Sequence, residues 1–181
     1  MPTNPPERIE TERLVLRPWR ADDAPALQSI VLHNLDHLQP WMPWATPEAH
    51  ERVEAVAARL AGFAADFAAG RDWGYVMTTR DDETLVGALG LHARIGPDAL
   101  EIGYWIRADY AGRGLVTEAV RAVVDAVFAT TDVARFEIRC DPHNAPSAAV
   151  ARRTGFTHVE TRVTEVEGVG TRETMVWERL R

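Results

Sequence analysis

The sequence is most constrained at one junction, where a strand-like run leads into a glycine-containing loop and a strongly amphipathic helix. Residues 100–106 form the run, residues 111–118 read Ala-Gly-Arg-Gly-Leu-Val-Thr-Glu, and apolar residues recur at helical spacing from Val116 to Phe128. Two glycines at such a junction let the backbone curl closely, while the first N–H groups of the helix remain unpaired. Together with the helix dipole, these N–H groups favour a phosphate or pyrophosphate. The loop therefore predicts an anion site, although the same glycines also suit a plain tight turn.

The predicted donors are the backbone amides from Gly112 to Thr117, and Arg113 adds a charged contact. Two other phosphate loops do not fit this segment. A nucleotide-hydrolysing P-loop would end in Gly-Lys-Ser/Thr, which is missing here. A dinucleotide loop would need a third glycine at Thr117 and a parallel β-α-β unit at the start of the chain. A nucleotide-binding regulator that uses the same loop stays open as an alternative, to be tested with ATP and NAD.

Hydrophobic periodicity along the rest of the chain predicts the element order β-α-α-β-β-β-α-β-α-β-β. The first helix is expected to be capped by Asp22 or Asp23 and to present an apolar face as far as Leu38. The order predicts an α/β fold, a mixed sheet of about seven strands with helices on both faces. We expect residues 1–10 to be a disordered, proline-rich segment and residues 11–181 to form a single domain. The predicted strands cover residues 13–19, 73–79, 84–92, 100–106, 134–140, 157–164 and 171–180.

Composition is ordinary for a globular protein and excludes several classes. The formal net charge of the 181 residues is −7, which does not indicate nucleic-acid binding. No apolar run approaches the ~20 residues of a membrane-spanning helix, and the start lacks the basic and apolar regions of a signal peptide. A single cysteine, Cys140, excludes an internal disulfide and is expected to be a buried structural thiol. We therefore expect a cytoplasmic protein with no nucleic-acid or membrane partner, and no residue spacing indicates a metal site.

Three motifs, taken in order, resemble one family. Glu101-Ile-Gly-Tyr-Trp-Ile106, followed by Gly112-Arg-Gly114 and Thr117-Glu-Ala-Val120, is similar to the acetyl-CoA motif of the GCN5-related N-acetyltransferases (the GNAT superfamily), and especially to its RimJ/RimL branch. Asn144-Ala-Pro-Ser147 with Gly155-Phe156 resembles the second signature of that branch, Asn-x-x-Ser…Gly-Phe. The opening Thr11-Glu-Arg-Leu-Val-Leu-Arg-Pro18 resembles its first strand. The chain departs from the superfamily pattern Gln/Arg-x-x-Gly-x-Gly/Ala at Ala111 and Val116.

The resemblance implies a GNAT-type sheet that is splayed between the fourth and fifth predicted strands, where a cleft takes the pantetheine arm of acetyl-CoA. It implies an acetyl-CoA-dependent N-acetyltransferase in which an amine attacks the thioester directly, most simply the α-amine of a protein or peptide N-terminus. A backbone N–H near Ile106 would polarise the thioester carbonyl, and related domains often form homodimers. The residues implied to bind the coenzyme are Ile106, Arg107, Gly112, Arg113, Gly114, Leu115, Val116, Thr117, Asn144 and Ser147.

Ser147 and Glu101 are the candidate catalytic residues. By the resemblance, Ser147 lies near the coenzyme sulfur and donates a proton to the leaving thiolate; otherwise it only satisfies backbone groups in the first turn of its helix. Glu101 is expected to act as a general base or to be an ordinary strand residue, and His92 and His143 compete for the role of base. Because an α-amino group has a pKa of about 7.7–8.0, an N-terminal acceptor needs a base less than a lysine does.

The acceptor is expected to bind between the first two helices, as the resemblance implies. Trp41 and Trp44 lie there in a proline-rich segment, and with His92 they are predicted to contact the substrate; the tryptophans would otherwise cover the core. Nothing in residues 33–50 separates a protein N-terminus from a small amine such as an antibiotic, a polyamine or an amino-acid derivative. A non-catalytic acyl-CoA-binding module is the alternative from another class, and the intact Asn-x-x-Ser signature argues against it.

Overall fold

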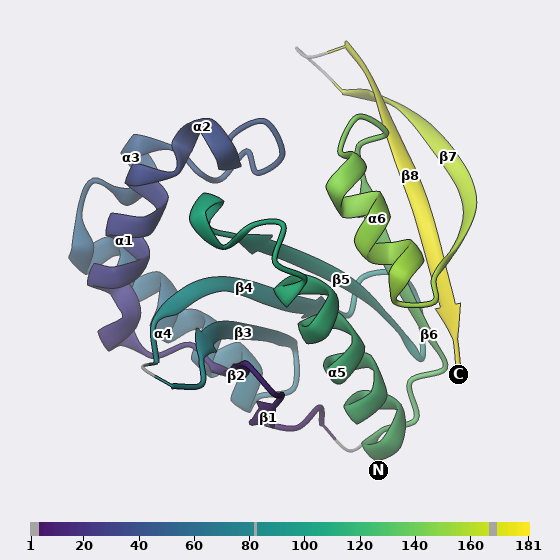
Figure 1. Ribbon diagram of the computed structural model, residues 1–181, viewed down its shortest axis with the longest axis horizontal. Helices are drawn as coiled ribbons and strands as arrows, with labels where there is room; N and C mark the ends of the chain where they lie inside the picture. The colour runs from purple at the N-terminus through teal and green to yellow at the C-terminus, as the bar shows by residue number, and fades with distance from the viewer. Residues whose placement is uncertain (1–3, 82, 167–169) are drawn as a thin grey trace.

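The computed structural model describes residues 4–81, 83–166 and 170–181. Across these residues one eight-stranded sheet runs in the order β1-β2-β3-β4-β5-β6-β8-β7 (Figure 1). All neighbouring strands are antiparallel except β5 and β6, so the sheet is mixed, as expected. The strands are β1 (Ile9–Glu10), β2 (Leu14–Pro18), β3 (Asp72–Thr79), β4 (Leu85–His92), β5 (Ala99–Ile106), β6 (Arg135–Cys140), β7 (Thr157–Val166) and β8 (Gly170–Leu180).

Helices cover both faces of the sheet, as the sequence predicted (Figure 1). Strand alternation separates two apolar clusters: in β3, Tyr75 and Met77 pack with α5 and α6, whereas Val76 packs with α1 and α4 on the opposite face. The helices are α1 (Ala24–His33), α2 (Leu35–Leu38), α3 (Pro47–His50), α4 (Val53–Ala68), α5 (Leu115–Thr130) and α6 (Ala145–Arg153), with short 3₁₀ turns η1 (Ala21–Asp23) and η2 (Ala108–Tyr110). No helix within the described ranges has the length and apolar character needed to cross a membrane.

The first strand departs from the prediction, which placed disorder through residue 10. Ile9 and Glu10 pair antiparallel with Leu16 and Val15, and the Ile9 side chain is buried in the cluster under α5. A buried apolar side chain and a set of paired backbone groups stabilise this strand against disorder. Residues 1–3, for which disorder was also expected, lie outside the described residues.

The predicted first helix is interrupted at Asn34, which separates α1 from α2. The Asn34 side chain donates to the Ile30 carbonyl at 2.8 Å and accepts from the Ala108 N–H at 2.9 Å, so it ties the break to η2. Asp23 is the N-cap residue of α1, as predicted, but its side chain makes no hydrogen bond to that helix. Its carboxylate instead accepts from the Arg20 N–H at 2.8 Å, in the capping box of η1, and forms an ion pair with Arg17 at 2.7 Å.

The sheet splays between β5 and β6, as the family resemblance implied. β5 pairs with β4 as far as Ile106, but its parallel pairing with β6 ends at Ile102 and Ile138. Beyond that point β6 stays paired with β8 through Cys140. The second half of β5 therefore has a free edge, and this edge positions the site.

Candidate active site

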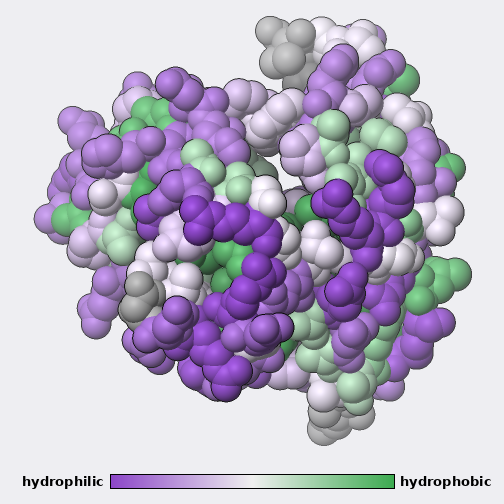
Figure 2. Space-filling model, in the orientation of Figure 1, coloured by the Kyte–Doolittle hydropathy of each residue, from purple (hydrophilic) through white to green (hydrophobic). Residues whose placement is uncertain are grey.

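A cavity of about 400 Å³ occupies the gap between β5 and β6. Figure 2 shows it as a hollow that is open to this face of the molecule. Most of its wall is formed by α2 and the turn after it, the second half of β5, the loop that begins α5, the end of β6, and α6, and Arg172 of β8 also lines it. Three of these segments carry the motifs that the sequence singled out, so folding brings those motifs to one place.

The glycine loop has the backbone geometry that the sequence predicted. Gly112 and Gly114 have φ angles of +74° and +78°, a region that residues with a Cβ rarely adopt. Gly114 is the N-cap of α5, and its carbonyl accepts the first helical hydrogen bond, from the Glu118 N–H at 3.0 Å. The amides of residues 115–117 precede that bond and have no acceptor within the helix. Leu115, Val116 and Thr117 all line the cavity, so this helix start faces it.

An ion cluster holds the loop against the N-terminal strand. The Glu118 carboxylate accepts from Thr11 Oγ1 at 2.6 Å and from the Arg13 N–H at 3.0 Å, and it forms an ion pair with the Arg13 guanidinium at 2.6 Å. Burial alone raises the pKa of the Glu118 carboxyl, but these partners outweigh burial and lower it. Arg13 also donates to the Arg113 carbonyl at 2.9 Å. The loop is thus fixed from behind, on the side away from the cavity.

Arg113 and Arg107 were both expected to bind the coenzyme, and neither lines the cavity. The Arg113 guanidinium lies over the Tyr110 ring at 4.9 Å. Arg107 forms an ion pair with Asp109 at 2.8 Å and donates to the Leu85 carbonyl, and its side chain lines a separate hollow beside α1. Arg107 was predicted to pair with the coenzyme through its backbone, and local partners direct its side chain away from the gap.

The backbone of β5 presents its free groups to the cavity. The Arg107 N–H donates to the Val86 carbonyl of β4 at 2.9 Å. Because successive residues of a strand direct their N–H and C=O groups to opposite sides, those of Tyr104 and Ile106 point away from β4, toward the gap. Consistent with this, the Ile106 carbonyl accepts from Nε2 of His37, a residue of α2 that lines the cavity, at 3.1 Å.

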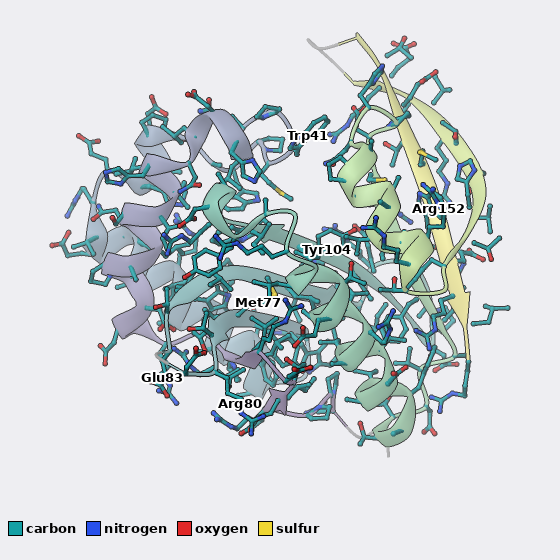
Figure 3. All side chains as sticks on the ribbon, in the orientation of Figure 1. Trp41, Met77, Arg80, Glu83, Tyr104 and Arg152 are labelled. Carbon is teal, nitrogen blue, oxygen red and sulfur yellow. The ribbon has the colours of Figure 1, made fainter. Side chains whose placement is uncertain are left out.

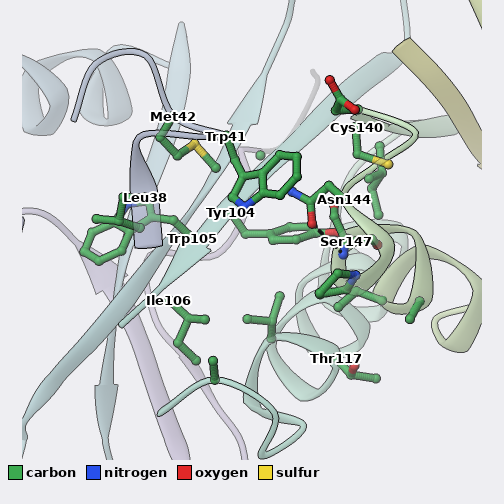
Figure 4. A pocket seen from close by; sticks show the side chains of 18 of the residues that line it. Leu38, Trp41, Met42, Tyr104, Trp105, Ile106, Thr117, Cys140, Asn144 and Ser147 are labelled. Atoms are coloured by element: carbon green, nitrogen blue, oxygen red, sulfur yellow. Dashed lines mark hydrogen bonds between the residues drawn. The ribbon is translucent and has the colours of Figure 1, made fainter. Parts of the chain in front are cut away.

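The second motif is placed as expected at the start of α6. Asn144 is the N-cap, and its Oδ1 accepts from the Ser147 N–H at 3.2 Å, so its predicted capping role is confirmed. Ser147 does not cap the helix with its hydroxyl. Its Oγ lies 3.0 Å from the hydroxyl of Tyr104, which also donates to the Ser147 carbonyl at 3.1 Å (Figure 4). Asn144, Ser147 and Tyr104 all line the cavity.

Glu101 lies on the opposite face of the sheet and does not line the cavity. Its carboxylate pairs with Arg94 at 2.6 Å and with Arg139 at 3.4 Å. Burial by itself raises the pKa of Glu101, but the two guanidinium groups outweigh it and lower the pKa. The lowered pKa and the two arginine partners weaken Glu101 as a base, and its role as general base stays a prediction. Strand alternation places Glu101 opposite Ile102 and Tyr104 on β5, although Gly103 and Trp105, which share its face, do line the cavity.

His92 shares the face of Glu101, because the two residues pair directly across β4 and β5. Its Nδ1 lies 2.8 Å from Asp72 Oδ2, and it is absent from the cavity lining. Its prediction as a substrate contact or base therefore has no geometric support. His143 also lies outside the cavity wall; it is exposed and bonds to Asp141 at 2.9 Å.

The two tryptophans predicted to meet the acceptor separate. Trp41 lines the cavity, and Figure 3 shows it pointing from the α2 side toward α6. Trp44 lies outside the cavity, 5.9 Å from both Trp105 and His50 as measured between ring centroids. Trp44 is 42% exposed, so it shields these two rings only in part, a position closer to the alternative prediction than to a substrate contact.

Tyr104, Cys140 and Asp141 line the cavity but were not among the predicted site residues. Tyr104 alternates with Ile102 on the face of β5 that packs with α5 and α6, and that alternation was the signal for it. Cys140 is buried, as predicted, and burial raises the pKa of its thiol. Asp141 follows directly after β6, at the edge where the strands diverge. Among the residues that the structure describes, no group of three or more histidine, cysteine or acidic side chains is placed to hold a metal ion.

Comparisons with known proteins agree with this geometry. The family model for the acetyltransferase (GNAT) domain matches residues 13–157. The ribosomal protein uS5-alanine N-acetyltransferase of Escherichia coli (strain K12) is 28% identical over 154 residues, which make up 84% of this chain and 79% of that protein. The ribosomal-protein-serine acetyltransferase of the same organism is 34% identical, but over only 82 residues, 44% of this chain and 45% of that protein.

Solved structures extend the similarity to nearly the whole chain. RimL, described as a ribosomal L7/L12 alpha-N-protein acetyltransferase in complex with coenzyme A, superposes with a TM-score of 0.85 at 27% identity and covers 96% of this chain and 98% of its own. RimJ of Mycobacterium smegmatis, in complex with CoA-disulfide, gives a TM-score of 0.81 at 28% identity and covers 99% and 86%.

Proposed function

This chain belongs to the GNAT acetyltransferases, and from that membership we propose that it transfers the acetyl group of acetyl-CoA to the α-amine of a protein or peptide N-terminus. One observation carries the proposal. A helix start with unpaired amides, a free strand edge and the Ser147 hydroxyl all face a single cavity. Acetyl-CoA matches all three, because its pyrophosphate needs an anion site, the amides of its arm need a free strand edge, and its thioester sulfur needs a proton donor.

The residues of the cavity fit the parts of acetyl-CoA. The pyrophosphate would lie at the amides of residues 112–117, where the glycine backbone leaves open space, since a Cβ at Gly112 would meet nothing within 4 Å. The amide-bearing arm would pair with the backbone groups of Tyr104 and Ile106 at the free edge of β5. The reactive end would then lie near Ser147, beyond the point where β5 and β6 part.

The reaction then balances as a direct transfer. The lone pair of the amine forms a bond to the acetyl carbon, and the carbon–sulfur bond breaks with its electron pair remaining on sulfur. Sulfur takes the proton of the Ser147 hydroxyl. The nitrogen gives up its surplus proton to water, and Ser147 recovers a proton from water. Ser147 thus acts as the general acid.

The position of the rejected bases favours an N-terminal acceptor. Neither Glu101 nor His92 lines the cavity, and each is already paired, Glu101 with Arg94 and His92 with Asp72. An α-amine, with a pKa of about 7.7–8.0, is partly neutral at pH 7.5 without help, whereas a lysine at about 10.4 is almost fully charged. The names of the relatives agree, since they include acetyltransferases of a ribosomal-protein alanine and of L7/L12.

Calorimetric titration with acetyl-CoA, with ATP and NAD as controls, tests the coenzyme. Binding of acetyl-CoA alone supports the proposal, whereas equal binding of ATP would move the loop to a nucleotide-binding function. Thiol release is then followed with a peptide that has a free N-terminus and with the same peptide N-terminally blocked but carrying a lysine. Release with the free peptide only supports α-amine transfer. Release with spermidine or an amino sugar but neither peptide would favour a small-amine acceptor, and binding without any release would favour an acyl-CoA-binding module.

The role of Ser147 is tested separately with Ser147→Ala. Removal of the hydroxyl is expected to lower kcat by about 10²-fold, within the range of general acid catalysis, while the Kd for acetyl-CoA stays within about twofold because the amide of residue 147 still bonds to Asn144. Unchanged turnover in Ser147→Ala would remove the assigned role.

A further inference from the structure

Tyr104 is the side chain that joins the two walls of the cavity. It stands on β5 next to the free edge, and its hydroxyl reaches Ser147 on α6, 43 residues along the chain. Figure 4 shows its ring extending from the strand to the first turn of α6. Because β5 and β6 are no longer paired at this level, the hydrogen bonds between Tyr104 and Ser147 connect β5 to α6 across the gap.

The Tyr104 hydroxyl has one hydrogen and two acceptors, Ser147 Oγ at 3.0 Å and the Ser147 carbonyl at 3.1 Å. If Tyr104 donates to Oγ, the proton of Ser147 can point to the Cys140 thiol beside it or into the cavity, which both residues line. If Tyr104 donates to the carbonyl instead, the Ser147 proton turns back to the Tyr104 oxygen. Rotation of two hydroxyl groups interconverts these arrangements, and the first is the one in which Ser147 can donate to a sulfur.

We propose that Tyr104 is a positioning residue for acetyl transfer, which donates its hydrogen bond to Ser147 Oγ and so directs the Ser147 proton at the leaving sulfur of the coenzyme. As negative charge develops on the sulfur, the arrangement with Tyr104 donating to Oγ becomes the favoured one. The hydrogen bond from Tyr104 also stabilises the serine oxygen as its own proton leaves. The inference rests on the proposed function and on the acid role of Ser147.

Tyr104 is suited to donate and unsuited to lose its proton. Burial raises the pKa of its hydroxyl, which therefore stays protonated at any pH at which the protein works. Without this hydroxyl, a serine in the first turn of a helix tends to donate to a nearby backbone carbonyl, which would draw its proton away from the cavity.

Tyr104→Phe keeps the ring and removes only the hydroxyl. We expect kcat to fall about three- to tenfold, the effect of one lost neutral hydrogen bond. The Kd for acetyl-CoA and the KM for the acceptor should stay within about twofold, since the backbone groups of residue 104 are unchanged. A lower kcat without a change in Kd is not what a general loosening of the cavity would give.

The decisive measurement is the double variant. If Tyr104 acts only through Ser147, adding Tyr104→Phe to Ser147→Ala lowers kcat no further. Tyr75→Phe is the matched control, because Tyr75 is also buried and its hydroxyl donates to the Pro6 carbonyl at 2.7 Å, outside the cavity. Its stability loss should resemble that of Tyr104→Phe, with kcat unchanged.

Each outcome either supports or overturns the role proposed for Tyr104. Loss of kcat in Tyr104→Phe that disappears in the Ser147→Ala background supports the proposal. An equal loss in both backgrounds, or no loss in either, overturns it while leaving acetyl transfer intact. If the unmodified protein binds acetyl-CoA but releases no thiol with any amine, the proposed function itself is overturned, and the variants are not needed to see it.

Discussion

Replacement of Gly114 by alanine tests whether the coenzyme loop works through its backbone. Gly114 has a φ of +78°, and a Cβ there would lie 3.6 Å from the Arg13 guanidinium, an ordinary contact distance. No steric clash is therefore expected, and the cost is the left-handed conformation alone, roughly 1–2 kcal/mol for a residue with a Cβ. In a domain of this size, that loss corresponds to a fall in Tm of about 2–8 °C.

The same strain should appear in coenzyme binding. Without ligand, the variant can relax its loop and escape part of the strain. With acetyl-CoA bound, the amides of residues 112–117 must return to the geometry that holds the pyrophosphate, so the strain is restored. Up to the same 1–2 kcal/mol is then subtracted from binding, which raises the Kd by about five- to thirtyfold. Asparagine tolerates this conformation better, and Gly114→Asn should show a smaller effect on both quantities.

Gly155→Ala is the matched control for this test. Gly155 ends α6 with a φ of +83°, and a Cβ there would make only ordinary contacts, 3.9 Å from the Arg179 side chain. It does not line the cavity. Its Tm should fall by a similar amount, while its Kd for acetyl-CoA stays that of the unmodified protein. Calorimetry and thermal unfolding measure both quantities. If Gly114→Ala lowers the Tm but binds acetyl-CoA as tightly as Gly155→Ala does, the loop does not hold the coenzyme through its backbone.

Three further predictions concern residues outside the cavity. Glu101→Gln should retain kcat within about threefold, since the Glu101 carboxylate pairs with Arg94 and does not line the cavity. The variant should lose roughly 1–2 kcal/mol of unfolding free energy in urea. A hundredfold loss of kcat would instead support Glu101 as the general base. The pKa of Glu118 is lowered in the folded protein, so the ionised carboxylate stabilises the fold above its unfolded pKa of about 4.3, and this stabilisation is lost as the pH falls through the folded pKa. The difference in unfolding free energy between the unmodified protein and Glu118→Gln, measured by urea unfolding, should therefore be full at pH 7 and disappear in acid. A difference that grew in acid would refute this sign. A Cβ at Gly87 would lie 2.3 Å from the Trp105 carbonyl oxygen, whereas one at Gly62 in α4 meets nothing within 4 Å. Gly87→Ala should therefore destabilise the protein by roughly 1–3 kcal/mol, and Gly62→Ala should stabilise it by about 0.5–1 kcal/mol. Thermal unfolding that ranked the two variants the other way would contradict the packing.

Local patterns in the sequence determined more than the order of the elements. The glycine loop at Gly112 and Gly114 and the cap at Asn144 depend on residues within a few positions of one another, and short-range geometry is what sequence spacing encodes. The sheet alternation is equally local. It placed Glu101 and Tyr104 on opposite faces from the start, although the sequence did not say which residues of β5 would line the cavity.

Only the tertiary structure decided that second point. Which residues of β5 line the cavity depends on where β6 stops pairing and on which helices cover each side, and both are set by residues far along the chain. The same applies to the contact between Tyr104 and Ser147 and to the separation of Trp41 from Trp44. These contacts join segments that no periodicity links, because they arise from packing between elements and not from the conformation within one.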